Sequence, residues 1–237
     1  MEVASLRLVL DHAGTRRKSW SIAADGIFSP GFHLVSGDVG SGKSTLALMM
    51  AGLYAPESGA VRREEITSTM LSFQFPEFHV TGLSVAEECA SWNLSPETAI
   101  AHAGIDVSPE TPALALSRGE LKRLHLACIL SRPCDLLLLD EPFSSLDCPG
   151  KEQVCRQISG RSGGITVIFT HEQSTFPAID HIWEISEGTL IDCGAMPGAL
   201  THWQHAPPLV KRLVGAGRIP ESITPEGLRE AACRIRG

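Results

Sequence analysis

Residues 37–45 form a run that could bind a chain of phosphates. Their sequence, GDVGSGKST, fits the spacing G-x-x-x-x-G-K-[ST], in which glycines let backbone N–H groups curl inward toward phosphate oxygens. We expect Lys43 to place its charge against the terminal phosphates and Ser44 to be a ligand of Mg²⁺. The candidate nucleotide contacts are Gly37, Asp38, Val39, Gly40, Ser41, Gly42, Lys43, Ser44 and Thr45. This pattern alone does not separate kinases, GTPases and ATPases.

Two carboxylates follow a second, wholly apolar run, Leu-Leu-Leu-Leu at 136–139. Because prolines bound this run at Pro133 and Pro142, it predicts a strand buried on both faces of a parallel sheet. The end of such a strand delivers Asp140 and Glu141 to the sheet edge where ligands bind. We expect Asp140 to hold Mg²⁺ or its waters and Glu141 to be the general base for an attacking water. A core strand that ends in a capping carboxylate is the alternative interpretation.

Ser117 begins a second candidate anion site. Residues 117–120 (SRGE) form a capping box, and the apolar spacing after them predicts a helix. Residues 84–87 (SVAE) form the same box with no implied chemistry. Ser117 differs in context, because Gly119 follows it and a capped helix start with a glycine binds anions. We therefore expect Ser117 and Gly119 to cap a γ-phosphate held by another subunit, with a simple helix cap as the alternative.

Polar residues also follow two further runs that resemble strands. Gln74 comes after 70–73 (MLSF), and His171 comes after 166–170 (TVIFT). Either residue alone would most often be an ordinary polar group at a strand end. Beside the phosphate loop and the carboxylates, we expect Gln74 to bind Mg²⁺ or the attacking water and His171 to bind the γ-phosphate. Residues 144–147 (SSLD), just past the carboxylates, would reach across a dimer interface.

Regular elements must hold these groups in place. Residues 31–36 predict a short buried strand, 37–43 the turn after it, and 46–53 the following helix. Residues 5–10 and 20–24 predict edge strands of a β-subdomain.

The rest of the chain predicts helices around this core. Between Gln74 and Ser117 we expect a compact insert with helices at 84–91 and 95–103. Residues 206–208 (APP) separate a tail, and its last helix starts at Thr224 with Pro225 at the first helical position.

As an ordered set, these motifs resemble the ATP-binding domain of ABC proteins over roughly residues 6–200. The matching motifs are Walker A at 37–45, the Q-loop at Gln74, the signature at 116–120, Walker B at 136–140 with catalytic Glu141, the D-loop at 145–147 and the switch histidine His171. The resemblance implies an α/β fold, a P-loop NTPase core of ABC ATPase type with a β-subdomain and a helical insert at about 75–132. It also implies a nucleotide-binding domain at 1–200 and a C-terminal helical extension at 201–237.

The same resemblance implies roles and partners. The cofactors would be ATP and Mg²⁺, and the Mg²⁺ ligands would be Ser44, Gln74 and Asp140. The catalytic residues would be Lys43, Gln74, Glu141 and His171. Ser117, Gly119 and Asp147 would contact the nucleotide of a second ABC ATPase subunit, in a homodimer or a heterodimer.

Two stretches resemble one branch of that family, the ATPase subunits of energy-coupling-factor transporters. One is 73–79 (FQFPEFH) followed by 82–88 (GLSVAEE), and the other is the tail at 208–228. The branch implies an importer of a vitamin or metal ion with a transmembrane partner. Phe75, Phe78 and Val80 would line a groove for that partner.

Three features depart from the family pattern: the signature, the helical insert between Gln74 and Ser117, which is compact, and the aromatic residue that stacks on adenine. The signature has Arg118 where glycine is usual and Glu120 where glutamine is usual. The aromatic residue that normally stacks on adenine is not evident, which leaves His12 and Trp20 as candidates.

Composition narrows the class of protein further. With 20 Lys and Arg against 27 Asp and Glu, the formal charge of −7 argues against a nucleic-acid partner. The seven cysteines have no metal-site spacing, which is typical of reduced cytosolic thiols. No signal peptide is recognisable, and no apolar run approaches the ~20 residues that span a bilayer. We expect a cytoplasmic protein that reaches the membrane face through its partner, without inserting directly.

Two other functions remain open at this point. One is a soluble ABC ATPase for assembly, for example of iron–sulfur clusters, whose partner is not embedded in a membrane. The other is a P-loop kinase of a small molecule, which leaves Ser117, Asp147 and His171 without roles.

Overall fold

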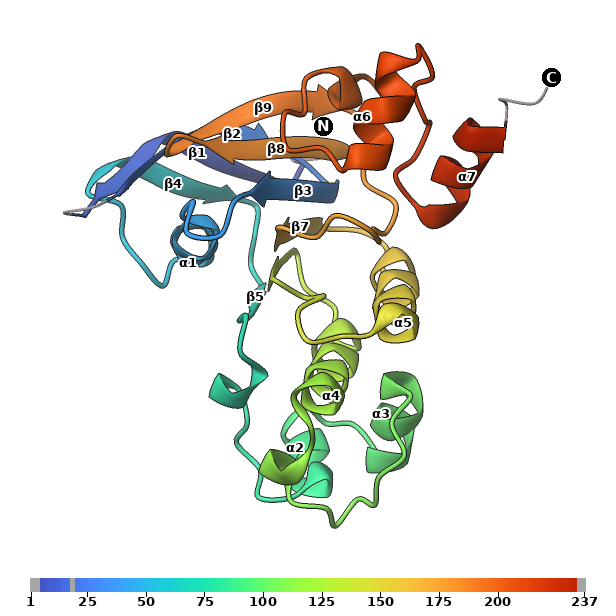
Figure 1. Ribbon diagram of the computed structural model, residues 1–237. Helices are drawn as coiled ribbons and strands as arrows, with labels where there is room; N and C mark the ends of the chain where they lie inside the picture. The colour runs from blue at the N-terminus through green and yellow to red at the C-terminus, as the bar shows by residue number, and fades with distance from the viewer. Residues whose placement is uncertain (1–4, 18–19, 234–237) are drawn as a thin grey trace.

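The computed structural model describes residues 5–17 and 20–233 (Figure 1). Within them, nine strands form one sheet in the order β4-β1-β2-β9-β8-β3-β7-β6-β5. The strands are β1 (Arg7–Arg16), β2 (Ser21–Phe28), β3 (Gly31–Gly37), β4 (Ser58–Glu64), β5 (Thr69–Ser72), β6 (Leu136–Asp140), β7 (Ile165–Thr170), β8 (His181–Ser186) and β9 (Thr189–Ala195). The helices are α1 (Lys43–Ala51), α2 (Val85–Ser91), α3 (Pro96–Ala103), α4 (Arg118–Leu130), α5 (Cys148–Ser159), α6 (Pro208–Gly215) and α7 (Pro225–Cys233). The structure confirms the predicted α/β fold class.

One half of the sheet is parallel and carries the motif residues at its strand ends. In it β5, β6, β7, β3 and β8 pair in parallel. Strand β6 is buried throughout, as its apolar run predicted. Leu137 and Leu139 pack in a cluster with residues of α4, α5, α6 and α7, whereas Leu136 and Leu138 pack with those of α1, β1 and β2. Both faces of the parallel half are therefore covered, which fixes β6 at the centre of the core.

The other half of the sheet is mainly antiparallel, and here the prediction of edge strands was wrong. Strand β1 pairs with β2 on one side and with β4 on the other, so β4 and β5 are the edges. Both β1 and β2 also run further than the predicted 5–10 and 20–24. The register of β1 shifts between Leu10 and Ala13, and this irregularity lets the polar residues there continue the strand.

Helix α1 begins and ends earlier than the predicted 46–53. It starts at Lys43, because Gly42 takes φ of 101° and turns the phosphate loop directly into the helix. It ends at Ala51, because Gly52 takes φ of 79° and its N–H bonds back to Met49 O at 3.1 Å. The phosphate loop therefore leads straight into a helix N-terminus.

The helical insert forms a separate lobe of α2, α3 and α4 that extends away from the sheet (Figure 1). Helices α2 and α3 confirm the two predicted helices, each capped by a serine: Ser84 accepts from Glu87 N and Ser95 from Thr98 N. The lobe has its own apolar cluster, which includes Val85, Cys89 and Leu124. The longer α4 also contributes Leu126 and Ile129 to the core beneath the sheet, so it joins the lobe to the core.

The tail packs on the core (Figure 1). Helix α7 begins where predicted, with Thr224 Oγ1 accepting the N–H of Gly227 at 3.2 Å. Trp203, Val210 and Leu228 belong to the same buried cluster as the core strands. The division at residue 200 stays a prediction, and residues 234–237 of the tail lie outside the described part. In the described ranges, no helix is both long and apolar enough to cross a bilayer.

Candidate active site

A pocket of about 260 Å³ lies over the N-terminus of α1. Its lining residues are Trp20, Val39, Gly40, Gly42, Lys43, Ser44, Thr45, Gln74, Glu141 and His171. The four predicted catalytic residues, which come from α1, the end of β5 and the ends of β6 and β7, therefore meet in one place. Two larger hollows, of about 410 and 480 Å³, lie beside α5 and contain none of the motif residues.

Lys43 lies inside the phosphate loop and is only 6% exposed. Its Nζ donates to Gly37 O at 2.8 Å and Asp38 O at 2.9 Å, and it lies 3.7 Å from Glu141 Oε1. Burial lowers the pKa of Lys43, while the charges of Glu141 and Asp140 act in the opposite direction. A cation is thus held between the loop and Glu141, at the N-terminus of α1 where anions such as phosphates bind.

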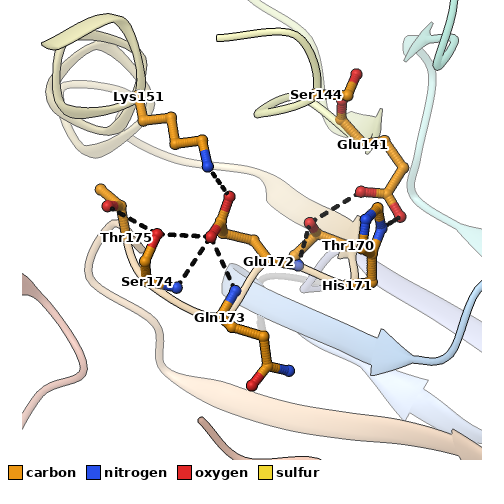
Figure 2. Close-up of polar contacts among 9 residues, drawn as sticks. All are labelled: Glu141, Ser144, Lys151, Thr170, His171, Glu172, Gln173, Ser174 and Thr175. Atoms are coloured by element: carbon orange, nitrogen blue, oxygen red, sulfur yellow. Dashed lines mark hydrogen bonds and ion pairs between the residues drawn. The ribbon is translucent and has the colours of Figure 1, made fainter. Parts of the chain in front are cut away.

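Glu141 is held in a fixed orientation at the end of β6 (Figure 2). Its backbone takes φ of 49° and donates to Phe169 O at 2.8 Å. Its Oε2 accepts the Thr170 hydroxyl at 3.0 Å, and its Oε1 lies 2.7 Å from His171 Nδ1. The carboxylate is 5% exposed, whereas the His171 ring is half exposed and faces the pocket. This arrangement suits a buried base that an exposed histidine can orient.

Asp140 and Ser44 have the chemistry of a Mg²⁺ site. Asp140 is buried, its Oδ1 has no hydrogen-bond partner, and burial raises the pKa of its carboxyl while hydrogen bonding to Ser44 lowers it. A buried oxygen without a partner beside a serine hydroxyl matches the hard oxygen ligands that Mg²⁺ prefers. Gln74 lines the same pocket as Ser44. The residues present therefore fit the ion.

Ser117, Gly119 and Asp147 lie outside this pocket. Ser117 and Asp147 are exposed, and each caps a helix: Ser117 caps α4, and Asp147 accepts the N–H of Gly150 at 3.0 Å in α5. A Cβ on Gly119 would lie 2.9 Å from Ser145 O, so the signature packs directly against the loop before α5. The structure thus places Gly119 against the loop that leads to Asp147, and leaves Ser117 and Asp147 exposed.

The capping box at Ser117 is complete, because the side chains of Ser117 and Glu120 each accept the backbone N–H of the other residue. The Glu120 carboxylate accepts the Ser117 N–H at 2.9 Å and its hydroxyl at 2.6 Å. These bonds lower the pKa of Glu120. To bind a phosphate, the Ser117 hydroxyl must exchange this carboxylate for the new acceptor. Arg118 lies 3.3 Å from Glu77 of the same chain, so its charge is paired within the subunit.

Sequence reasoning missed the groups that support His171. Glu172 pairs with Lys151 of α5 and accepts from the N–H groups of Gln173 and Ser174, each at 2.9 Å (Figure 2). Glu172 N also donates to Thr170 Oγ1 at 3.0 Å, so the support reaches Glu141 through Thr170. The position of Glu172 directly after His171 was the only signal in the sequence.

The tail also reaches the phosphate loop, which the sequence did not indicate. Trp203 Nε1 donates to Ser36 Oγ at 2.6 Å, just before the loop. The His205 ring lies between buried Glu184 and Asp38, with its Nε2 3.4 Å from Asp38 Oδ2. The start of the tail therefore helps to hold the loop in place.

Trp20, not His12, lines the pocket beside Gly42. The His12 ring instead pairs with Asp25 at 2.7 Å on the exposed face of the β-subdomain. Trp20 is thus the better placed of the two candidates for stacking on adenine.

Replacing Trp20 by alanine is expected to weaken ATP binding by about 2- to 13-fold, the equivalent of an aromatic stacking pair worth about 0.5–1.5 kcal/mol. The affinity for inorganic triphosphate should not change, because that ligand has no base. Isothermal titration calorimetry with both ligands checks this, with His12→Ala as the matched control. Equal losses for the two ligands would contradict a role in stacking.

Fold and site together define a class. A phosphate loop at the carboxyl end of a parallel sheet, a histidine at the end of the neighbouring strand β7, a buried carboxylate pair at the end of β6 beyond it and a helical insert describe a P-loop nucleotide-binding domain. The comparisons with known proteins narrow this class to one family.

The profile of the ABC transporter family matches residues 29–144. An uncharacterized ABC transporter ATP-binding protein of Mycobacterium tuberculosis is 33% identical over 82% of this chain, and the chain spans only 31% of that protein. The energy-coupling factor transporter ATP-binding protein EcfA2 of Thermotoga maritima is 28% identical over 84% of this chain and 86% of its own length. The cbiO1 structure of Clostridium perfringens, part of the ABC transporter complex cbiONQ, has a similar fold, with a TM-score of 0.59, 22% identity and coverage of 78% and 86%. The chain belongs to the ABC transporter ATP-binding family.

Proposed function

We propose that this chain is the ATP-hydrolysing motor subunit of a membrane transporter, an energy-coupling-factor type importer of a vitamin or metal ion. The observation that carries the proposal is the meeting of Lys43, Gln74, Glu141 and His171 in one pocket. The similarity to EcfA2, which extends over most of both chains, favours the energy-coupling-factor branch.

In this proposal the phosphates of ATP lie along the loop and over the N-terminus of α1. Lys43 neutralises charge on the β- and γ-phosphates, and Glu141 takes a proton from the attacking water. Thr170 and His171 keep the Glu141 carboxylate aimed at that water. A Mg²⁺ ion held by Ser44, Asp140 and Gln74 would supply further positive charge for the phosphate oxygens.

A second ABC ATPase subunit completes the site in this proposal. Ser117, Gly119 and Asp147 do not line the pocket of their own chain, so they can contact a nucleotide held by the partner, with the Ser117 hydroxyl exchanging the Glu120 carboxylate for a phosphate oxygen. ATP binding would then favour the closed dimer by its greater affinity for that state, and hydrolysis would release it.

The transmembrane partner would bind beside Gln74, on the cytoplasmic face of the membrane. Phe75 and Phe78 are exposed and pack edge to face, with ring centroids 6.0 Å apart. Val80, predicted to share this groove, instead packs against the apolar cluster of the insert. The proposed contact is therefore smaller than the sequence indicated.

Replacing Ser117 by arginine tests the shared site. We expect ATP turnover to fall at least about 100-fold, because a bulky cation then fills the space of an oriented donor, while ATP binding to the same chain persists. Ser84→Arg is the matched control: it removes a cap of the same type, at a cost of about 0.5–2 kcal/mol, and should leave turnover intact. Steady-state hydrolysis and equilibrium binding are the measurements. Unchanged turnover in Ser117→Arg, with a protein that stays monomeric with ATP, would favour the kinase.

The partner is identified by mass spectrometry of proteins that co-purify from detergent-solubilised cells. Glu141→Gln with ATP present holds the closed state during purification. Recovery of a protein with several membrane spans, with or without a second ATPase, supports the transporter and settles the type of dimer. Recovery of soluble partners alone would instead support the assembly ATPase.

A further inference from the structure

Helix α4 has a polar stripe on the face that meets the Gln74 segment, residues 73–79. Arg118, Lys122 and His125 follow the i, i+4, i+7 spacing that places side chains on one face of a helix. Each of them contacts the Gln74 segment, and the first helical residue, Arg118, directly follows Ser117. A helix usually packs against the rest of a protein with apolar residues, so a polar stripe on the packed face of α4 is unusual.

Lys122 is the centre of this stripe. It is 1% exposed, and its Nζ donates to Phe73 O at 3.1 Å and to Gln74 O at 2.8 Å. Burial lowers the pKa of Lys122 to about 8, although the carboxylates of Asp140, Glu141 and Glu77 act in the opposite direction. An ammonium group is costly to bury, and here it donates to the carbonyls of two successive peptide units, one on each side of the Gln74 Cα.

Two histidines, His79 within the segment and His125 of α4, hold the same segment at a second point. The Phe73 N–H donates to His79 Nε2 at 2.8 Å, and the His79 ring stacks on the ring of His125, with centroids 4.1 Å apart. His125 is buried, neither of its ring nitrogens has a hydrogen-bond partner, and burial lowers its pKa well below the usual value. Its ring thus serves as a packing surface for His79. Phe73 is fixed at its N–H and at its C=O, and Gln74 follows directly.

We propose that Lys122 is a positioning residue for Gln74. By holding the carbonyls of Phe73 and Gln74, the ammonium fixes the backbone from which the Gln74 side chain reaches the pocket. Lys122 holds the start of the segment, and Arg118 and His125 contact its other end at Glu77 and His79. We therefore expect α4 and the Gln74 segment to move together. This inference rests on the proposed hydrolysis of ATP only in its kinetic test.

The kinetic test is a double-mutant cycle. Lys122→Met keeps the chain length but removes the donors, and kcat should fall about 10- to 100-fold, the cost of a catalytic group misplaced by about 1 Å. The affinity for ATP should change less than about 2-fold. Gln74→Ala should lower kcat as well, and adding Lys122→Met to it should cause no further loss, because Lys122 acts through Gln74. Losses that multiply in the double variant would overturn the proposal.

The matched control is Arg123→Met. Arg123 is the next residue of α4, and its Nη1 donates to Gly104 O at 2.8 Å in the insert, away from Gln74. This variant should keep the wild-type kcat, and a loss equal to that of Lys122→Met would overturn the proposal by indicating a general effect of α4. If Lys122→Met does not fold, Lys122→Arg takes its place, since it keeps the charge and more than one donor. It should retain more than half of the wild-type kcat, and a loss greater than 10-fold would count against the proposal.

A second measurement does not depend on hydrolysis. Hydrogen exchange of the backbone amides of 73–79 should speed up at least about 10-fold in Lys122→Met and stay at the wild-type rate in Arg123→Met. Unchanged exchange in Lys122→Met would overturn the proposal. If the wild-type chain hydrolyses no ATP but the exchange result holds, the proposed function fails while the positioning of the segment by Lys122 stands.

Discussion

Glu141→Gln is expected to lower ATP turnover by about 10²- to 10⁴-fold, the range of a lost general base. The substitution keeps the size and shape of the side chain and removes its ability to take a proton. Nucleotide binding should be retained, because the change removes a negative charge from the pocket that would hold the phosphates. The dimer with ATP should also last longer, since hydrolysis no longer releases it.

The position of Glu141 allows the loss of the general base to be measured without a change in the local fold. Its backbone φ of 49° is available to glutamine as to glutamate, and its N–H bond to Phe169 O does not involve the side chain. The amide can still accept from the Thr170 hydroxyl, so the strand end should keep its geometry. A large loss of turnover would therefore show that the Glu141 carboxylate takes a proton during hydrolysis.

Single-turnover hydrolysis and analytical ultracentrifugation with ATP are the measurements for Glu141→Gln. Glu97→Gln, on the exposed side of α3, removes the same charge far from the pocket and is the control. Turnover within 10-fold of the wild type would mean that another group takes the proton and that the role assigned to Glu141 is wrong.

Lys43→Met is expected to weaken ATP binding by about 10- to 150-fold, which corresponds to about 1.5–3 kcal/mol for hydrogen bonds to a charged group. Turnover at saturating ATP should fall as well, because negative charge that builds up on the phosphates loses its nearest cation. Lys43 is the buried cation between the loop carbonyls and Glu141, and its removal leaves that carboxylate without its ion pair.

Equilibrium titration with ATP and with ADP checks the effect of Lys43→Met. Lys211→Met, on the exposed face of α6, removes a lysine of the same charge outside the site and is the control. The affinity for ATP should separate the two variants, because Lys43→Met loses affinity whereas Glu141→Gln keeps it. A Lys43→Met protein that binds ATP as tightly as the wild type would refute a phosphate-binding role for this lysine.

Local patterns in the sequence predicted a large part of the fold. The apolar run of β6 predicted a strand buried on both faces, because only a central parallel strand can bury consecutive leucines on alternating sides. The serine caps of α2 and α3 and the threonine cap of α7 predicted helix starts, because a cap depends on residues three or four positions apart. The spacing of residues 37–45 predicted for the same reason which groups of the phosphate loop line the pocket.

Predictions failed where the pattern was not local. The order of strands at the β-subdomain depends on pairing between residues far apart in the chain, so β1 could not be placed inside the sheet from its own composition. The irregularity in β1 likewise hid the second half of that strand, because it interrupts the alternation of buried and exposed residues.

The sequence by itself determined the family, the α/β core and the identity of the groups in the pocket, because motifs with fixed short spacing carry that information. Only the tertiary structure decided how these groups are supported. Lys122 reaches Gln74 across 48 positions of the chain, Thr170 reaches Glu141 across 29, and His205 reaches the phosphate loop from the tail. Each of these contacts joins separate elements, and their distance is set by how the sheet and the helices pack. No short pattern records that packing, since many residue types satisfy it.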